Sequence, residues 1–240
     1  MRAYAEWPAP VALRHAVACL WSAVAEEDAD TLVLPDACSD LIWEQGKGAY
    51  VAGPDTGPNP ARARAGTTMF GVRFRASAGG PVLGLPLSEL RDQRVDLADV
   101  LPAVARRLPA TLDPQVAEIS VLDLAARLVA DSEPDKVVAH AAHMLNDPRI
   151  RTEDVAAELA LSTRQFRRRC HDTAGYGPKT LQRILKFRRF VARIDAWSEN
   201  LDLAAIAADV GYADQAHLTR ECARLAGLTP TALMKVRGAG

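Results

Sequence analysis

The chain has 240 residues, enough for one large domain or two domains of ordinary size. Its apolar fraction of 49% is that of a globular protein, and no segment approaches the roughly 18 apolar residues that a membrane span needs. The start of the chain has no apolar signal core, so we expect a soluble cytoplasmic protein without a membrane partner.

Charge is distributed unevenly along the chain. Residues 1–133 contain 12 Lys and Arg against 18 Asp and Glu, whereas residues 134–240 contain 17 against 12. An acidic half followed by a basic half predicts that only the second half contacts a polyanion. The polar residues 131–135 lie at this change. We therefore divide the chain into an N-terminal domain, 1–133, and a C-terminal domain, 134–240.

The N-terminal domain, up to about residue 96, has the pattern of short strands separated by turns. The predicted strands are residues 17–24, 31–34, 41–44, 49–52 and 67–75. Gln45 to Gly48 joins two of them as a hairpin, whereas the residues 54–65, rich in Pro, Gly and Arg, are predicted to form a loop. Many short strands separated by Gly and Pro predict a small barrel or sandwich.

From Leu97 onward the spacing of apolar residues becomes helical. It predicts a helix over about 97–108 and another that begins at Asp113-Pro114, an N-cap followed by a proline suited to the first helical position. The basic domain opens with a helix over about 137–145. We therefore expect an α+β chain, with a small β-barrel or sandwich-like N-terminal domain that carries helices and an all-α C-terminal domain.

The C-terminal domain contains a sequence repeat with an offset of about 52 residues. VAAELAL at residues 155–161 returns as IAADVGY at residues 206–212. Further positions correspond as follows: Phe166 with Leu218, Cys170 with Cys222, Gly175 with Gly227 and Pro178 with Pro230. Such a period indicates one small helical unit built twice. Its order of short helix, tight turn, second helix and Gly-x-x-Pro is that of a helix-turn-helix.

The two units and the segment between them have dimensions that suit DNA. We place the first helix-turn-helix at about residues 152–175 and the second at about 202–227, joined by a helix over about 179–197. A joining helix of about 16 residues is roughly 24 Å long. Adding the radii of the units brings their second helices to about one DNA turn, roughly 34 Å, apart. We therefore predict double-stranded DNA as the partner, read in successive major grooves.

The second helix of each unit has an apolar inner face and a polar outer face. In the first unit Phe166 and Cys170 face inward. The outer face, spaced i, i+3, i+4, i+7, consists of Arg164, Arg167, Arg168 and His171. Arginine can form a fork with O6 and N7 of guanine, and a good contact contributes roughly 1–3 kcal/mol of discrimination. The matching outer positions of the second unit are Gln215, Ala216, Thr219 and Arg220.

These residues resemble the DNA-binding half of AraC/XylS-type transcription regulators. Residues 161–169 and 175–178 resemble the first helix-turn-helix of that family, and residues 209–222 and 227–230 resemble the second. The resemblance covers about residues 136–237. The base-reading positions that it implies are Arg164, Arg167, Arg168, Gln215, Thr219 and Arg220. The DNA-binding residues that we predict also include His171, Ala216 and Lys179.

Two further expectations come from the same resemblance. Cys170 and Cys222 stand where the family usually has phenylalanine, so both helical cores should be smaller or filled from elsewhere. Residues 34–43 and 70–74 of the N-terminal domain resemble, more loosely, effector-type domains of bacterial regulators. Such domains usually sense a small molecule or mediate dimerisation. A small-molecule effector of unknown identity and a homodimer are therefore the further partners that we expect of a bacterial activator or repressor.

Histidines and cysteines could indicate metal or redox chemistry. His140 and His143 are spaced i, i+3, but no carboxylate or cysteine partner is evident at ligand spacing, so we predict a structural role. Cys19 and Cys38 could sense oxidants or metals, although inert buried thiols are the simpler interpretation. The four cysteines include no C-x-x-C pair. We therefore predict neither a metal nor a cofactor.

Aromatic and acidic residues of the N-terminal domain could line a ligand pocket. Trp7, Trp21 and Trp43 could form an aromatic cage, but we favour positions in the core. Asp36 and Asp40 could form the polar edge of a pocket, but turn chemistry accounts for Asp36 equally well. Neither group identifies a ligand.

Two other classes of protein are alternatives to a regulator. One is an enzyme that carries a helix-turn-helix, either metal-dependent or a DNA-repair methyl acceptor. It would need clustered histidines or a zinc-type cysteine cluster, yet residues 1–133 contain only His15, and Cys19 and Cys38 form no such cluster. The other is a ligand-binding or dimerisation protein with weak DNA affinity. We predict a sequence-specific DNA-binding regulator without catalytic residues.

Overall fold

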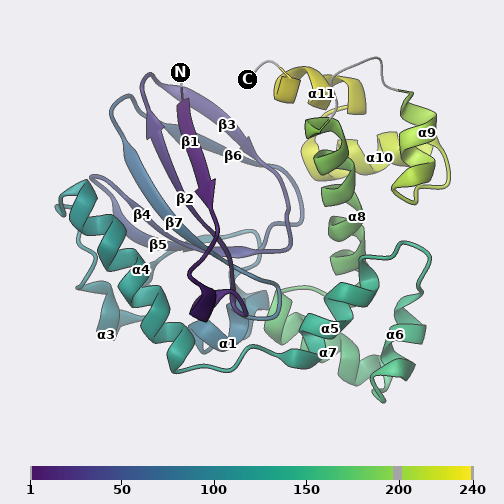
Figure 1. The fold of residues 1–240 in the computed structure, drawn as a ribbon, viewed down its shortest axis with the longest axis horizontal. Helices are drawn as coiled ribbons and strands as arrows, with labels where there is room; N and C mark the ends of the chain where they lie inside the picture. Colours follow the sequence, from purple (N-terminus) through teal and green to yellow (C-terminus); the bar gives the residue numbers. More distant parts are fainter. Residues whose placement is uncertain (1, 197–201, 239–240) are drawn as a thin grey trace.

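The computed structural model describes residues 2–196 and 202–238. A β-rich N-terminal part and an all-helical C-terminal part lie side by side (Figure 1), so the predicted α+β organisation is confirmed. The strands are β1 (Arg2–Trp7), β2 (Val17–Ala25), β3 (Ala29–Val33), β4 (Ser39–Glu44), β5 (Gly48–Ala52), β6 (Asn59–Ala63), β7 (Thr68–Phe74) and β8 (Arg94–Asp96). The helices of the same part are η1 (Val11–Leu13), α1 (Gly79–Leu83), η2 (Leu87–Leu90), α2 (Leu97–Val100), α3 (Pro102–Ala105) and α4 (Pro114–Ala130).

The strands form two sheets. One is antiparallel with the order β1-β2-β7-β4-β5-β8, and β3 and β6 form a separate two-stranded sheet. The predicted hairpin is confirmed, because β4 pairs with β5 through partners such as Leu41 and Val51. The strand β3 pairs with β6 rather than with β2, which precedes it in the sequence.

The prediction of a loop over residues 54–65 is wrong, because Asn59–Ala63 forms β6. Pro60 gives this segment the composition of a loop. However, β6 pairs with a single neighbour, and an edge strand tolerates a proline that has no N–H to donate. The strands β1 and β8 have no counterpart among the predicted ones, since β1 lies at an edge of the large sheet and β8 has only 3 residues.

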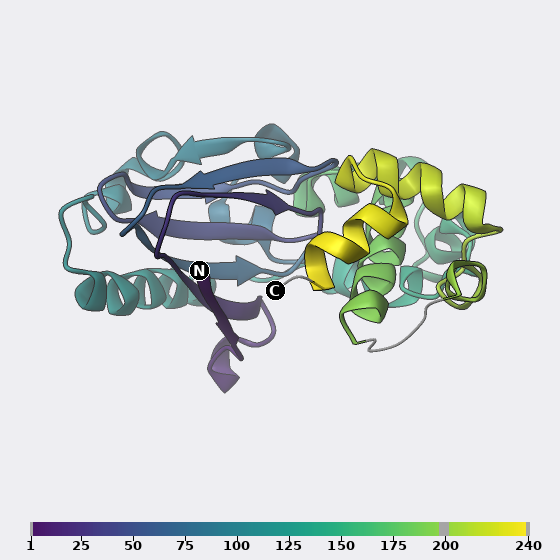
Figure 2. The ribbon, with the colours of Figure 1, turned by 90° about the horizontal axis from the view of Figure 1, so that it is seen from above.

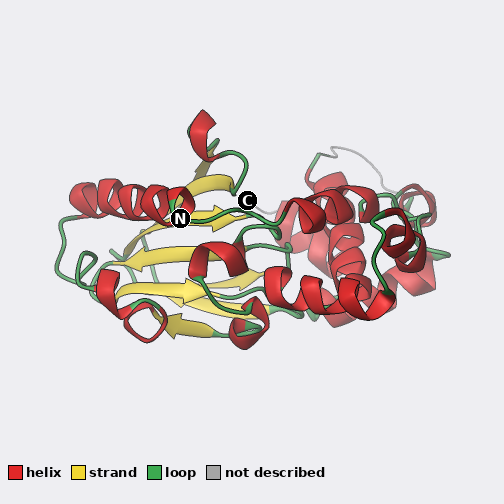
Figure 3. Cartoon of the chain, turned by 90° about the horizontal axis from the view of Figure 1, so that it is seen from below, coloured by secondary structure: helices red, strands yellow, loops and turns green. Residues whose placement is uncertain are grey.

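Both faces of the large sheet are buried. In β4, Leu41 and Trp43 belong to the core that contains Val121 and Leu124 of α4, whereas Ile42 belongs to a smaller core on the opposite face. Figure 3 shows α4 lying along the sheet. The uninterrupted apolar run at this point of the sequence therefore corresponds to a strand that packs on both sides.

The tryptophans of the sheet occupy core positions. Trp21 is 7% exposed and Trp43 is fully buried, and they lie in the cores on opposite faces, so they do not form one aromatic cage. Their indole N–H groups donate to Asp40 Oδ1 at 2.7 Å and to the carbonyl of Pro109 at 2.9 Å. Trp7 is half-buried and packs against the core of Trp43. The favoured interpretation is confirmed for Trp21 and Trp43.

The helix predicted over 97–108 is interrupted. Leu101 has φ −136 and ψ 69, and it separates α2 from α3. The following Pro102 is the cause, because a proline disfavours helical geometry in the residue before it. The start of α4 agrees with the prediction, since Asp113 caps the helix by accepting the N–H of Gln115 at 2.9 Å.

The C-terminal part contains the two predicted helix-turn-helix units. Its helices are α5 (Lys136–Leu145), α6 (Thr152–Glu158), α7 (Thr163–Ala174), α8 (Pro178–Asp195), α9 (Leu203–Asp209), α10 (Gln215–Ala226) and α11 (Pro230–Gly238). The first unit is α6 with α7, the second is α9 with α10, and α8 joins them. Trp197, at the end of the predicted joining helix, lies outside the described residues.

One core holds both units together. Cys170 and Cys222 are fully buried in it, and its large aromatic side chains include Phe187 and Phe190 of α8, whose ring centroids are 6.4 Å apart. Phe166 of α7 also belongs to this core. Both cysteines are thus part of one continuous core to which the joining helix contributes large aromatic side chains.

The N-terminal and C-terminal parts are in direct contact at one end of the large sheet (Figure 2). Ala37, which has φ 65, is buried in the core of the C-terminal part. A Cβ at Gly80 of α1 would lie 2.3 Å from the carbonyl oxygen of Asp172, and one at Gly175 would lie 2.4 Å from Cγ of Pro54. The end of α7 is therefore packed closely against the N-terminal part.

Candidate nucleic-acid interface

The two helix-turn-helix units have the same turn. Leu161 N donates to the carbonyl of Ala156 at 2.9 Å, and the equivalent Tyr212 N donates to that of Ala207 at 2.7 Å. The residue before each donor has a positive φ, 52° at Ala160 and 89° at Gly211. The sequence repeat therefore reproduces the hydrogen bond that sets the direction of the second helix.

The second helices, α7 and α10, are called the recognition helices from here on, and each is capped at both ends. Ser162 forms a capping box with Gln165, since Gln165 N donates to Ser162 Oγ at 3.2 Å and Ser162 N donates to Gln165 Oε1 at 2.9 Å. Asp214 caps α10 by accepting the N–H of His217 at 2.6 Å. Both helices end at a left-handed glycine, Gly175 with φ 85 and Gly227 with φ 66.

The outer face of α7 carries the predicted arginines. Arg164, Arg167 and Arg168 are exposed, and within the described residues none of them has an ion pair or a side-chain hydrogen bond. The neighbouring Arg169 differs, because its Nε lies 2.6 Å from Asp135 Oδ2. Three guanidinium groups on α7 are thus available to an external acceptor, whereas the fourth holds α7 to the start of α5.

The outer face of α10 is less basic. Gln215, Ala216 and Arg220 are exposed, and Thr219 is half-buried. The Thr219 hydroxyl donates to the carbonyl of Gln215 at 2.8 Å. Its proton is therefore used within the helix, so Thr219 can offer a partner its methyl group and an acceptor oxygen.

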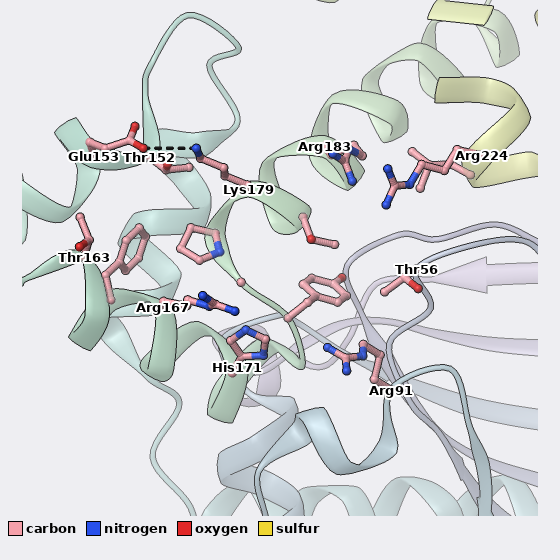
Figure 4. Close-up of a pocket in the computed structure, with 16 residues that line it drawn as sticks. Thr56, Arg91, Thr152, Glu153, Thr163, Arg167, His171, Lys179, Arg183 and Arg224 are labelled. Atoms are coloured by element: carbon pink, nitrogen blue, oxygen red, sulfur yellow. Dashed lines mark ion pairs between the residues drawn. The ribbon is translucent and has the colours of Figure 1, made fainter. Parts of the chain in front are cut away.

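A groove of about 590 Å³ lies between the two recognition helices, with the start of α8 along it (Figure 4). The basic residues that line it are Arg91, Arg167, His171, Lys179, Arg183 and Arg224. Lys179 Nζ pairs with Glu153 Oε1 at 3.4 Å, and Arg183 Nε pairs with Glu221 Oε2 at 3.0 Å. The groove therefore has a surplus of positive charge.

Three of these basic residues, Arg167, His171 and Lys179, are among the DNA-binding residues predicted from the sequence. Arg183 and Arg224 are not among them, because they stand on the flanks of α8 and α10 and not on the outer faces from which the prediction was made. Each follows a predicted DNA-binding residue by about one helical turn, and this spacing could have indicated both of them. Arg91 could not have been found in this way, because only the fold brings the N-terminal part to the groove.

Comparison with known proteins agrees with this geometry. Residues 155–235 match a family described as a helix-turn-helix domain, and residues 5–96 match a domain family of unknown function, DUF6597. The C-terminal part therefore carries a helix-turn-helix domain, the kind of DNA-binding module that the sequence repeat predicts. No curated protein matches it significantly.

The chain also has a distant likeness to solved structures of ToxT from Vibrio cholerae. ToxT from strain O395 has 7% sequence identity and a TM-score of 0.49, over 92% of this chain and 97% of that chain. ToxT from strain SCE256 with a bound unsaturated fatty acid has 10% identity and a TM-score of 0.45, over 90% and 93%. These values describe a remote similarity of overall shape.

The titration of His171 predicts that DNA binding at the groove depends on pH. Burial and the positive charges of Arg167 and Arg91 lower the pKa of His171, and Asp172 opposes this only in part. The imidazole is therefore neutral near pH 7, and a DNA phosphate beside it would favour the charged form. We expect DNA affinity to rise as the pH falls below about 6.5, because protonation then adds a cation to the groove.

Fluorescence anisotropy with a labelled random-sequence duplex, at about pH 7.5 and about pH 5.5, measures this effect. The His171→Gln variant, which cannot be protonated, should show a smaller gain in affinity on acidification. An equal gain in both proteins would assign the pH dependence to other groups.

The histidines and cysteines that could indicate metal or redox chemistry do not form a cluster among the described residues. No group of three or more His, Cys, Asp or Glu side chains there could hold a metal ion, and no helix there is long and apolar enough to cross a membrane. His140 and His143 are exposed on α5. Burial raises the pKa of the Cys19 thiol to about 11 and that of Cys38 well above its usual value, so both are protonated near pH 7.

Proposed function

We propose that the two recognition helices enter successive major grooves on one face of double-stranded DNA. The observation that carries this proposal is the repetition itself. Each unit has the same turn, a side-chain N-cap, a left-handed glycine at the end of its second helix and buried residues at matching positions, so the outer face lies in an equivalent place in each. The joining helix α8 has 18 residues, about 27 Å at the usual rise, which suits a separation of roughly one DNA turn.

Within this proposal, arginines supply most of the base contacts of the first groove. Arg164, Arg167 and Arg168 are exposed and have no ion-pair partner among the described residues, so no such pair has to break before they reach guanine. The base-facing residues proposed for α10 are Gln215, Ala216, Thr219 and Arg220. Lys179 stands at the start of α8 and is proposed to contact the backbone, with His171 beside it.

We also propose that the N-terminal part modulates DNA binding. Arg73 Nε lies 3.3 Å from Asp36 Oδ2 and 3.2 Å from Asp40 Oδ1 on the face of the large sheet that also holds Trp21. The next residue after Asp36 is Ala37, which is buried in the core of the helical part. A small-molecule effector that displaced these carboxylates would therefore move a residue on which the DNA-binding part packs.

The Asp36 side chain also accepts the N–H of Cys38 at 2.9 Å, which is the predicted turn chemistry, so Asp36 both forms the turn and belongs to the polar cluster. A small-molecule effector and a homodimer stay predictions from the resemblance of this domain.

Selection of bound duplexes from a random pool by the full chain tests the proposal. We expect enrichment of two half-sites about ten base pairs apart, one for each recognition helix. Enrichment of a single half-site would mean that one unit alone reads bases. Absence of any enrichment, together with binding to random duplexes only at low salt, would instead favour a ligand-binding or dimerisation protein with weak DNA affinity.

A further inference from the structure

Arg91 belongs to the N-terminal part but faces the groove between the recognition helices. It follows η2, and its Nη1 lies 3.5 Å from the carbonyl oxygen of Gly175, the residue that ends α7. Figure 4 shows Arg167, Arg91 and Arg224 pointing from three sides toward the same space. These three arginines come from α7, from the N-terminal part and from α10, respectively.

None of the three arginines is neutralised by the protein. Within the described residues, Arg91, Arg167 and Arg224 have no carboxylate partner, although Lys179 and Arg183 in the same groove do. Like charges that converge on a concave surface raise its positive potential and attract an anion. The groove lies between two helices proposed to occupy successive major grooves, where a DNA backbone must cross.

The position of Arg91 is fixed relative to α7. Gly80 and Gly175 allow the two parts to approach so closely that a Cβ on either would overlap a neighbouring atom. The loop that contains Gly57 extends the same contact to α10, because a Cβ at Gly57 would lie 3.7 Å from the carbonyl oxygen of Arg224. Arg91 therefore stays beside the recognition helices without a rearrangement of the N-terminal part.

We propose that Arg91 binds a phosphate of the DNA backbone between the two half-sites, so that the N-terminal part contacts the operator directly. This inference rests on the proposed function of α7 and α10. A phosphate at this position would be shared by Arg91 and Arg224 of α10, and the positive charge of Arg167 would add to the attraction. DNA would thereby hold the N-terminal part and both helix-turn-helix units in one arrangement.

The salt dependence of DNA binding by the full chain tests this proposal. Affinity for a labelled random-sequence duplex of about 30 base pairs is measured between about 50 and 200 mM salt. Each phosphate contact contributes about −0.9 to the slope of log K against log salt. Arg91→Gln should make the slope shallower by about 0.9 and weaken binding equally on all sequences, whereas Arg91→Lys should keep the wild-type slope.

Two controls separate this role from others. Arg106 is exposed and follows α3, a helix that lies far from α7 and α10 in Figure 1. It is the matched control, and Arg106→Gln should leave the slope unchanged. Arg91→Glu should change the slope more than Arg91→Gln. An unchanged slope in Arg91→Gln overturns the proposal, and so does an equal loss in Arg91→Gln and Arg91→Lys, which would indicate that the contact with Gly175 matters rather than the charge.

Failure of this inference is distinguishable from failure of the proposed function. If the wild-type chain binds duplexes and Arg168→Ala weakens specific binding while Arg91→Gln has no effect, only the role of Arg91 is wrong. If the wild-type chain binds no duplex at either salt concentration, the proposed function itself is wrong.

Discussion

Replacement of Arg168 by alanine is expected to relax the base preference at one position of the operator. Arg168 is exposed near the middle of the outer face of α7 and has no partner among the described side chains. Loss of a two-nitrogen contact with guanine should remove about 1–3 kcal/mol of discrimination, roughly a tenfold to hundredfold loss of affinity for the preferred site. Competition between duplexes that differ at single base pairs measures this loss.

The adjacent Arg169 provides the matched control. Arg169 is bound to Asp135 and stands on the flank of α7, so Arg169→Ala should weaken the contact between α7 and α5 but keep the base preference. If Arg168→Ala weakened DNA binding equally on all sequences, Arg168 would contact a phosphate instead of a base.

Replacement of Phe166 by alanine is expected to lower the free energy of unfolding by about 3–5 kcal/mol. The Phe166 side chain is 1% exposed and packs in the core shared by both helix-turn-helix units and α8. Its removal leaves a cavity that the surrounding helices can fill only in part. Urea titration followed by circular dichroism measures the change, and DNA affinity should fall together with it.

Phe166→Leu is the conservative comparison for this prediction. It retains an apolar side chain of similar volume and should cost less than about 1.5 kcal/mol. If Phe166→Ala proved as stable as Phe166→Leu, the core around α7 would have to collapse around the smaller side chain, and the packing described for it would be wrong.

The helix-turn-helix units were predictable because the sequence features that specify them are local and occur in both units. A turn at Ala160 and Gly211, a cap at Ser162, and inward positions spaced by four residues all act within about one turn of helix. Each local preference agrees with the global packing, which is the condition under which sequence patterns indicate structure reliably. The outer faces of α7 and α10 follow from the same periodicity.

The features that sequence reasoning missed depend on contacts between distant segments. Pro60 looked like a loop residue because the pairing of β6 with β3 across an intervening hairpin is invisible locally. The helix over 97–108 was predicted from apolar spacing alone, although Pro102 outweighs that spacing. Arg91 reaches the groove between the recognition helices only through the packing of Gly80 and Gly175 between the two parts.

The two recognition helices differ in how tightly their ends are attached to the N-terminal part. A Cβ at Gly175 would lie 2.4 Å from Pro54 Cγ, whereas one at Gly227 would lie 3.5 Å from Pro58 Cγ, an ordinary van der Waals distance. The end of α7 is therefore packed more closely against the N-terminal part than the end of α10 is. Operators whose half-sites differ by one base pair in separation would therefore be accommodated by displacement of α10, while α7 keeps its register.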